Sequence, residues 1–305
     1  MPARSPVTPE YIKQVNTLYH DAAAPDYDSK WGIDFGPIGR RQVREKLVKA
    51  LGRWPEMPFG EALEIGSGTG YFALNLLQLG AIERVVATDI SPAMLATLAR
   101  TAGRLGVDAR TRLADAERLP FADERFDLVF GHAVLHHLPD LDRALAEFHR
   151  VLRPGGAVAF CGEPSRYGDL IAALPKRGAQ LAAPLWRLAL GASARRPEAE
   201  ENGHGHDLEH EVDVHSFAPS RLARLLGESG FQGVRIAGEE LLANVYGWAV
   251  RTLESSADPA DVPYRWRELA FRGYLALQRI DTALLEPRLP PSIFYNLVLS
   301  ARKPA

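Results

Sequence analysis

ALEIGSGTGYF, residues 62–72, joins a short apolar run to an apolar helical pattern through three glycines at alternate positions. The preceding run, EALEI, is typical of a buried strand, and YFALNLLQLG is typical of a helix that ends at Gly80. Gly66 and Gly68 allow a tight strand-to-helix turn whose backbone N–H groups can touch a ligand, because no Cβ atom intervenes. The turn therefore predicts a bound cofactor beyond the carboxyl end of this strand.

Short strand patterns and longer helix patterns alternate along the middle of the chain. The strand pattern RVVATDI precedes a helix for which Ser91 is the expected N-cap and Pro92 the first residue. Further strand patterns follow near 109–114 and in FDLVFGHAV, AVAFCGE, QGVRIAG and IFYNLVLSAR, with helix patterns in LDRALAEFHRVL and APSRLARLLGESGF. This alternation predicts an α/β fold with a parallel sheet and helices on both faces.

Two long interruptions break the alternation, and both have mostly helical patterns. Because they leave the sheet after its later strands, we expect them to fold over one edge as helical caps, residues 164–216 and 240–291. The core then consists of three segments, 61–163, 217–239 and 292–305.

Composition narrows the class of protein. A chain of 305 residues with 46% hydrophobic residues can bury a full core, and one cysteine, Cys161, cannot form an internal disulfide. The net charge of −2 leaves no global basic field for nucleic acid or an anionic membrane. The first residues show no signal region and no apolar run reaches about 18 residues, so we expect a soluble, cytoplasmic protein without a transmembrane segment.

The glycine pattern differs from that of a dinucleotide-binding turn. The third glycine of G-x-G-x-x-G is replaced by Tyr71, and a glycine comes one residue early, at Gly70. Glu64 precedes the turn, where a carboxylate would repel a pyrophosphate but suit a ligand with an ammonium and a sulfonium group. The turn therefore favours a cofactor other than NAD.

Two aspartates follow the neighbouring strand patterns. Asp89 closes VVATDIS, where its carboxylate can accept hydrogen bonds from both ribose hydroxyls; Ser91 is already available to cap the next helix. Asp115, after the third strand pattern, could accept a hydrogen bond from an adenine amino group. Both residues predict contacts with a nucleoside.

Four motifs in order resemble the class I S-adenosylmethionine-dependent methyltransferases, in particular their small-molecule, type 11-like group: LEIGSGTG, ATDISPAML, ADAERLPFADERFDLVFGHAVLHHLPD and EFHRVLRPGGAVAF. The resemblance covers residues 61–163 closely and resumes loosely at HSFAPSRLARLLGESGF and the last strand. It implies a Rossmann-like, doubly wound, mostly parallel seven-stranded sheet with an antiparallel last strand. It also implies S-adenosyl-L-methionine as cofactor and residues 1–60 as an N-terminal helical cover.

The resemblance also assigns cofactor-binding residues. Those that would surround the methionine portion, with Gly70 supporting the turn, are Glu64, Gly66, Ser67 and Gly68. Asp89 would hold the ribose, and the residues expected around the adenine are Ile90, Met94, Asp115 and Ala116. His132 would lie beside the methionine and Tyr27 near the cofactor. Asp127, at the start of the fourth strand, is compatible with either a cofactor contact or local pairing.

Three histidines in GHAVLHHLPD are candidate catalytic residues, namely His132, His136 and His137. The family model places them at the floor of the acceptor pocket, where a histidine could take a proton from a hydroxyl. The alternative for LHHL is a capped, hydrogen-bonded helix start without a catalytic role. Alignment and desolvation can supply most of the catalysis in an in-line methyl displacement, so a base is not required.

The acceptor is expected to be a small molecule. No Asn- or Asp-Pro-Pro-aromatic loop, catechol-type carboxylate cluster or basic stripe occurs at the expected place. The first interruption is apolar apart from Lys176, Arg177 and Arg187. The second has two apolar helical faces, one with Trp266, Leu269, Leu277, Ile280 and Leu284 and one with Phe271 and Tyr274. Such faces form either a cap core or a pocket for an apolar, lipid-like acceptor.

Other interpretations remain open at this point. A nicotinamide-dependent oxidoreductase is disfavoured by Tyr71 and Glu64, and a non-catalytic scaffold that binds S-adenosylmethionine is compatible with the same motifs. His204, His206, His210 and His215 could supply metal ligands, but their spacing defines no ligand framework and a solvated loop is the better interpretation.

Overall fold

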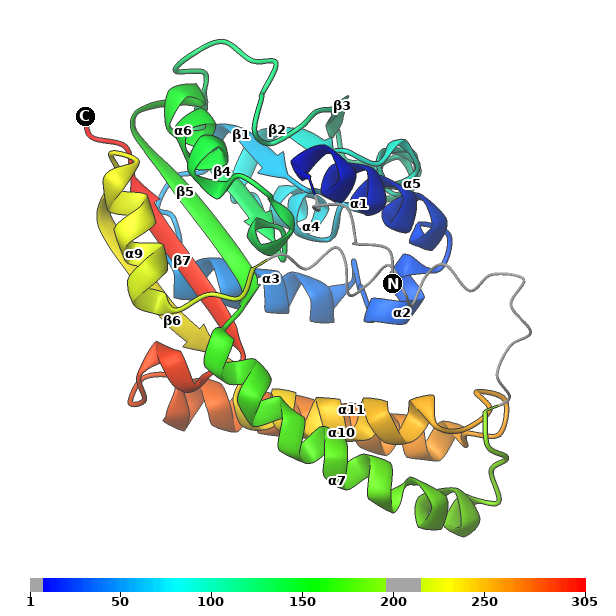
Figure 1. Cartoon of the computed structure of the whole chain (residues 1–305). Coiled ribbons are helices and arrows are strands. Elements are labelled where there is room, and N and C mark those ends of the chain that lie inside the picture. Colours follow the sequence, from blue (N-terminus) through cyan, green and yellow to red (C-terminus); the bar gives the residue numbers. More distant parts are fainter. Residues whose placement is uncertain (1–7, 196–214) are drawn as a thin grey trace, which may run out of the picture.

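A computed structural model describes residues 8–195 and 215–305. Seven strands form one sheet in the order β3-β2-β1-β4-β5-β7-β6 (Figure 1). Their bounds are β1 Phe59–Ile65, β2 Ile82–Asp89, β3 Arg110–Leu113, β4 Phe126–His132, β5 Leu152–Pro164, β6 Gln232–Glu239 and β7 Asn296–Arg302. The first five strands pair in parallel, and β7 pairs antiparallel with both β5 and β6. This confirms the predicted Rossmann-like sheet with its antiparallel last strand.

Alternate residues of β1 show how the sheet is covered on both faces. Leu63 and Ile65 belong to the buried cluster that includes α6 (Leu141–Val151) and α9 (Pro219–Glu228). Ala62 belongs to the opposite cluster, which includes α3 (Pro37–Leu51) and α4 (Tyr71–Gln78). Because both faces are covered there, the buried second half of β1, residues 62–65, is apolar except for Glu64.

The sequence of α6 illustrates how a covering helix is specified. Its apolar residues recur every three or four positions and are all buried: Leu141, Ala144, Leu145, Phe148 and Val151. Asp140 caps the helix by accepting a hydrogen bond from the Arg143 N–H at 3.0 Å. The ring of Phe148 stacks on Phe160 of β5 at 5.4 Å between centroids, which fixes the helix against the sheet.

Six further helices lie in the described part of the chain, and one of them, α5, also covers the sheet at β2 and β3. They are α1 (Pro9–Ala23), α2 (Tyr27–Trp31), α5 (Pro92–Leu105) and, beyond the sheet, α7 (Arg166–Leu190) with α10 (Leu242–Ser255) and α11 (Tyr264–Ile280) packed beside it. The segment LHH forms a short 3-10 helix, Leu135–His137, and a second 3-10 turn at Pro291–Ile293 delays the last strand to Asn296. None of these described helices is long and apolar enough to cross a lipid bilayer.

Helices α7, α10 and α11 form an arm that extends from the sheet (Figure 1). Trp186 of α7 contacts Trp266 of α11 with 5.2 Å between ring centroids. The ammonium of Lys176 lies 3.7 Å from the ring centroid of Trp248 on α10. We propose, as the sequence suggested, that this helical arm caps an acceptor site.

A buried polar cluster attaches the helical arm to the core. On α3, Lys46 pairs with Glu239, and Lys49 pairs with Glu239 at 3.1 Å and with Glu286 at 2.9 Å. Glu240, directly after β6, accepts hydrogen bonds from two α11 residues, Tyr274 Oη at 2.8 Å and Gln278 Nε2 at 2.7 Å. Burial would lower the pKa of Lys46, but the Glu239 and Glu240 carboxylates outweigh it and raise that pKa.

Candidate functional site

The three glycines between β1 and α4 all have left-handed backbones, with φ of 58° at Gly66, 51° at Gly68 and 95° at Gly70. A Cβ atom at Gly66 would lie 2.3 Å from Val134 Cγ2, and one at Gly70 would lie 2.8 Å from Leu98 Cγ. At Gly68, nothing lies within 4 Å of that position. Two glycines are therefore required by packing, whereas Gly68 faces open space in which a ligand can approach the backbone.

Two buried polar groups beside this turn have an atom without a partner. Glu64 is 1% exposed and its Oε2 atom has no hydrogen-bond partner; the same holds for the Ser67 hydroxyl. Burial raises the pKa of the Glu64 carboxyl well above its usual range, and the Asp89 carboxylate adds to this effect. Unpartnered buried groups are costly, so they indicate a missing ligand. The amino acid portion of S-adenosylmethionine fits them, since its ammonium can pair with Glu64.

Asp89, at the end of β2, holds the turn in place. Its Oδ2 atom accepts the Gly68 N–H and its Oδ1 atom accepts the Ser91 N–H, both at 2.8 Å. Ser91 caps α5 through the Met94 N–H at 3.1 Å, as the sequence predicts. Each carboxylate oxygen of Asp89 keeps a further lone pair, so ribose binding stays a prediction that this geometry allows.

The N-terminal helices are tied to the same edge of the sheet. Asp28 of α2 accepts a hydrogen bond from Thr69 Oγ1, inside the glycine turn, at 2.6 Å. Asp21 of α1 accepts one from Ser91 Oγ at 2.5 Å. These two contacts place the helices over the carboxyl ends of β1 and β2.

His20 is a site residue that the sequence reasoning did not single out. Its ring lies 6.1 Å from Tyr27 and 5.7 Å from His137. Burial raises the pKa of the Asp89 carboxyl, and the nearby His20 offsets part of that shift. The only sequence signal was its place in LYHDAAAPDYD, next to Asp21. Tyr27 therefore lies among the residues around the glycine turn, and His20 joins α1 to the histidines after β4.

Asp115 is engaged by α1. Its Oδ2 atom lies 2.8 Å from Lys13 Nζ, and its Oδ1 atom accepts the Glu117 N–H at 2.9 Å. Lys13 also pairs with Glu117. The Asp115 side chain is 38% exposed, so it retains room for an adenine contact, which stays a prediction. The neighbouring apolar positions expected around adenine, Ala116 and Met94, are buried, and Ile90 is half-buried.

Asp127 lies at the opposite edge of the sheet from the glycine turn. Its Oδ1 atom is 2.6 Å from Arg153 and its Oδ2 atom accepts the Glu61 N–H at 2.9 Å. Of the two interpretations that the sequence left open, local pairing is the one that this position supports.

His136 is fixed by a buried carboxylate. Its Nδ1 atom lies 2.9 Å from Glu163, which also accepts the backbone N–H groups of Val134, Leu135 and His136 at 2.9–3.2 Å. The His137 ring lies 3.9 Å from that of His136. This is the hydrogen-bonded turn that the sequence offered as the alternative to a base. It also orients His136, because a proton on Nδ1 leaves the Nε2 lone pair as the basic site.

His132 is an uncharged residue of the site. Its ring stacks on Phe72 at 5.5 Å and meets Tyr71 edge-on at 5.4 Å. Burial, with a smaller contribution from Lys46, lowers the pKa of His132 from 6.5 to about 3. His132 is therefore neutral near pH 7 and a weak proton acceptor.

We expect His132 to make the protein acid-sensitive. Between pH 6.5 and 3 the unfolded state binds a proton on this residue that the folded state does not, so stability falls as the pH falls. Relative to His132→Gln, the wild type should lose at most about 1.4 kcal/mol per pH unit in this window. Urea denaturation of both proteins from pH 7 to 4 measures this difference, and parallel profiles would contradict the lowered pKa.

The histidine-rich stretch was considered above as a source of metal ligands. Three of its four histidines, at positions 204, 206 and 210, lie outside the described residues. His215 is described, and its Nε2 atom lies 3.1 Å from the Leu138 carbonyl oxygen. Its backbone N–H donates to the His136 carbonyl at 3.2 Å, which places it beside the turn after β4.

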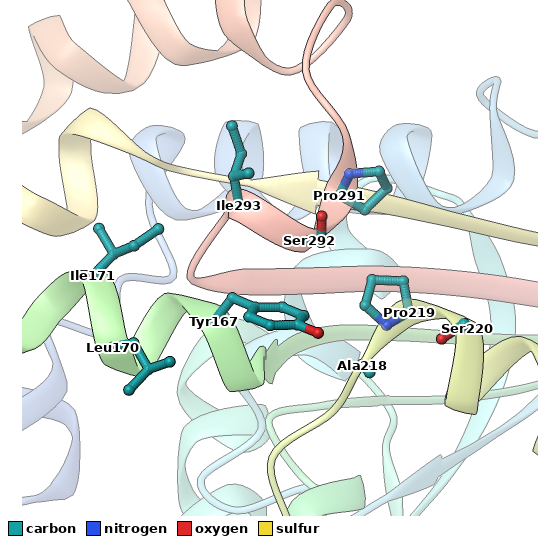
Figure 2. Close-up of a pocket in the computed structure, with 9 residues that line it drawn as sticks. All are labelled: Tyr167, Leu170, Ile171, Ala218, Pro219, Ser220, Pro291, Ser292 and Ile293. Atoms are coloured by element: carbon teal, nitrogen blue, oxygen red, sulfur yellow. The ribbon is translucent and has the colours of Figure 1, made fainter.

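An apolar cavity of about 590 Å³ opens beside the carboxyl end of β5. Figure 2 shows Tyr167 between the start of α7, the start of α9 and the turn before β7. The residues lining the cavity are Tyr167, Leu170, Ile171, Ala218, Pro219, Ser220, Pro291, Ser292 and Ile293. None belongs to the faces of the second interruption that the sequence left open as a cap core or a pocket lining: Leu269 and Ile280 of α11 are exposed, as is Leu284 after it, and Tyr274 binds Glu240. The expected face is thus covered only in part: Trp266 packs on Trp186 of α7, whereas Leu269 and Ile280 are exposed.

Comparison with known proteins identifies the central segment. Residues 63–160 match the family model described as a methyltransferase domain. A malonyl-[acyl-carrier protein] O-methyltransferase of Methylococcus capsulatus is 37% identical over 144 residues, which cover 44% of this chain and 51% of that protein. A demethylmenaquinone methyltransferase of Thermus thermophilus is 40% identical over 117 residues, 38% of this chain and 50% of that protein. The chain thus spans about half the length of these relatives.

Solved structures show the same fold over nearly the whole chain. A phosphoethanolamine N-methyltransferase 2 of Haemonchus contortus, in complex with phosphomonomethylethanolamine and S-adenosylhomocysteine, has a TM-score of 0.59 at 16% identity and covers 96% of this chain and 59% of that one. The [4+2]-cyclase SpnF has a TM-score of 0.56 at 17% identity and covers 96% of both chains. The second example shows that this fold also carries chemistry named differently.

Proposed function

We propose that this chain, whose residues 63–160 match the family model of a methyltransferase domain, is a class I S-adenosylmethionine-dependent methyltransferase that transfers a methyl group from that cofactor to a small apolar acceptor. The observation that carries the proposal is the buried, unpartnered carboxylate oxygen of Glu64 beside the open backbone at Gly68. A carboxylate there suits a cationic ligand and repels a pyrophosphate, which argues against the nicotinamide alternative.

Residues of this chain would bind and orient the donor. Glu64 and Ser67 would hold its amino acid portion, and Asp89 would accept hydrogen bonds from the ribose. When bound, S-adenosylmethionine supplies a methyl group already activated by its sulfonium, so the protein need only align and desolvate the acceptor. The helices α1 and α2 would exclude water, through the contacts of Asp28 and Asp21.

The acceptor-side residues would be the histidines after β4. His132, which is neutral, would line the methyl-transfer site. His136 would take a proton from the acceptor where one has to be removed, since Glu163 directs its Nε2 lone pair and stabilises its protonated form. His137 and His20 lie beside it and would complete this wall.

An apolar acceptor is supported by the cavity at the start of α7. β5 is two strands from β1, a lateral distance of about 10 Å, so an acceptor with a short chain can reach from the cavity to the glycine turn. The segment 215–217 lies between the cavity and His136, and it would border the bound acceptor. The name of one relative, a demethylmenaquinone methyltransferase, agrees with an apolar acceptor, whereas the other acts on an anionic, carrier-bound malonyl group.

Calorimetry and a methyl-transfer assay test the proposal in two steps. Titration with S-adenosylhomocysteine should give saturable binding, whereas NAD should not bind; binding of NAD alone would overturn the donor assignment. Radiolabelled methyl transfer is then measured with three acceptors: a long-chain fatty acid, whose carboxylate can attack the methyl group, a prenylated hydroquinone and a polar amine. Transfer to the fatty acid or to the hydroquinone supports the proposal. Cofactor binding without transfer to any of the three would favour the scaffold interpretation.

We expect Asp89→Asn to weaken cofactor binding by about 1 kcal/mol, five-fold or somewhat more, because one charge-assisted acceptor becomes a neutral one. Asn retains a carbonyl oxygen for one of the two backbone N–H groups, so the turn should persist. The dissociation constant of S-adenosylhomocysteine measures the effect, and Asp127→Asn, at the opposite edge of the sheet, is the control. Equal constants for all three proteins would count against the ribose assignment.

A further inference from the structure

The outward face of α7 carries a line of five exposed leucines, interrupted between Leu174 and Leu181. They are spaced three, four or seven residues apart, which places them on one side of the helix, and they are 68–83% exposed: Leu170, Leu174, Leu181, Leu185 and Leu188. We call these five residues the leucine stripe. The opposite face carries Ala172, Ala179 and Ala183, which are buried against the rest of the helical arm. The inner face alone would therefore suffice to hold α7 in place.

Single exposed leucines are common on protein surfaces, but five in line on one helix are not. From Leu170 to Leu188 the leucine stripe extends over 18 residues, about 27 Å of helix at 1.5 Å per residue. In the part of the chain that the structure describes, nothing covers it. Such a surface has the dimensions of an interaction site.

Charge indicates what would cover the leucine stripe. The α7 sequence contains four cationic residues and one acidic residue, and so does that of α11, while the whole chain has a net charge of −2. Arg166 and Arg177 of α7 are exposed. On α11, Arg265, Arg272 and Arg279 recur every seven residues and are also exposed. The helical arm is thus locally basic in a chain that is acidic overall, and it complements an anionic surface.

We propose that α7 docks on an anionic lipid surface, with the leucine stripe at the boundary between headgroups and acyl chains and the arginines of the arm at the phosphates. Helices that lie in the plane of a membrane combine an apolar face with Arg and Lys in this way. In the proposed orientation α7 lies along the bilayer; no described helix is long and apolar enough to span one. A two-fold contact of α7 with a second copy would bring Arg177 and its equivalent into the same apolar interface, and this like-charge contact disfavours a dimer.

The position of the cavity agrees with this orientation. Leu170 belongs to both the leucine stripe and the cavity lining, and Tyr167 and Ile171 line the cavity one turn of α7 away or less. Figure 2 shows these three side chains at the start of α7. A lipid-like acceptor could therefore pass from the membrane surface into the cavity without crossing water. This last step rests on the proposed function, whereas the docking does not.

Sedimentation of the full chain with lipid vesicles tests the docking. The probes are vesicles of phosphatidylcholine alone and with about 30% phosphatidylglycerol at about 0.1 M salt. We expect binding to the second kind only, weakened by added salt. The affinity of the double variant Leu181→Gln/Leu185→Gln for the anionic vesicles should be lower by about ten-fold or more, because two apolar side chains no longer enter the lipid. The control variants Leu18→Gln and Met57→Gln, at positions 55% and 77% exposed outside the arm, should bind like the wild type.

Three outcomes would overturn the proposal. The first is that the wild type does not bind anionic vesicles. The second is that the control variants lose as much vesicle binding as the Leu181→Gln/Leu185→Gln variant. The third is a dimer in light scattering that the Leu181→Gln/Leu185→Gln variant converts to a monomer, which would assign the leucine stripe to a second copy. Titration with S-adenosylhomocysteine on the same samples separates the two hypotheses. If the protein binds the cofactor but not the vesicles, only the docking is rejected. If it binds the vesicles but not the cofactor, only the donor assignment is rejected.

Discussion

Glu64→Gln is expected to weaken S-adenosylhomocysteine binding while it stabilises the protein without cofactor. The buried Glu64 carboxylate loses its charge-assisted contact with the ligand's ammonium, a loss of about 1.5–3 kcal/mol, roughly 10- to 150-fold in the dissociation constant. Without ligand the same carboxyl destabilises the folded protein, because its Oε2 atom is buried without a hydrogen-bond partner. A neutral amide removes the cost of ionising it, so the thermal unfolding temperature should rise at pH 8.

The pH dependence supplies a second readout for Glu64. Its pKa is raised in the folded protein, so the folded state binds more protons than the unfolded state above the ordinary value of 4.5, and stability falls as the pH rises through the folded pKa. A cationic ligand favours the ionised form, so binding releases a proton and the wild-type affinity should increase with pH. Glu64→Gln should abolish this dependence. Calorimetry at several pH values measures it, and unchanged affinity in the variant would remove the main support for a cationic donor.

Lys46→Met is expected to destabilise the protein by about 3–5 kcal/mol, the typical cost of leaving a buried charge without its partner. Glu239 is 1% exposed and would keep only Lys49, at 3.1 Å. Its carboxyl, whose burial would raise the pKa, is held at a pKa of about 2 by Lys46 and Lys49. Urea denaturation at pH 7 measures the loss. Because Glu239 adjoins Glu240, which binds α11, we also expect the attachment of the helical arm to loosen.

Two further variants test whether the loss of stability in Lys46→Met comes from the unpaired buried charge of Glu239. Arg53→Met removes an exposed ion pair with Glu56, whose side chains are 73% and 76% exposed, and should cost about 0–1 kcal/mol. The double variant Lys46→Met/Glu239→Gln removes both charges of the buried pair and should recover part of the stability, since no unpaired carboxylate remains. A loss below about 1 kcal/mol in Lys46→Met would mean that the cluster does not attach the arm.

The individual strands, the glycine turn and the capping of α5 could be predicted because their causes are local, whereas the strand order of the sheet came from the family resemblance. Apolar strand patterns, Gly66 and Gly68 in the turn, and Ser91 before Pro92 each act within a few residues of the chain. The roles of Asp115 and Asp127 depended on distant partners. Lys13 lies 102 positions before Asp115, and Arg153 lies 26 positions after Asp127. Neither ion pair could therefore be predicted from the spacing of residues in the sequence.

In the candidate site and the helical arm, some features follow from local sequence motifs and others depend on tertiary contacts. The residue types near the methyl donor follow from motifs that are contiguous in the chain, because the carboxyl ends of parallel strands meet at one edge of a sheet. The cavity, the environment of His136 and the exposure of the leucine stripe arise from contacts between segments far apart in the sequence. Burial is a property of packing, so one apolar helix such as α7 can have a buried face and an exposed one. A net charge of −2 likewise could not indicate a basic arm, since charge acts through its position in space.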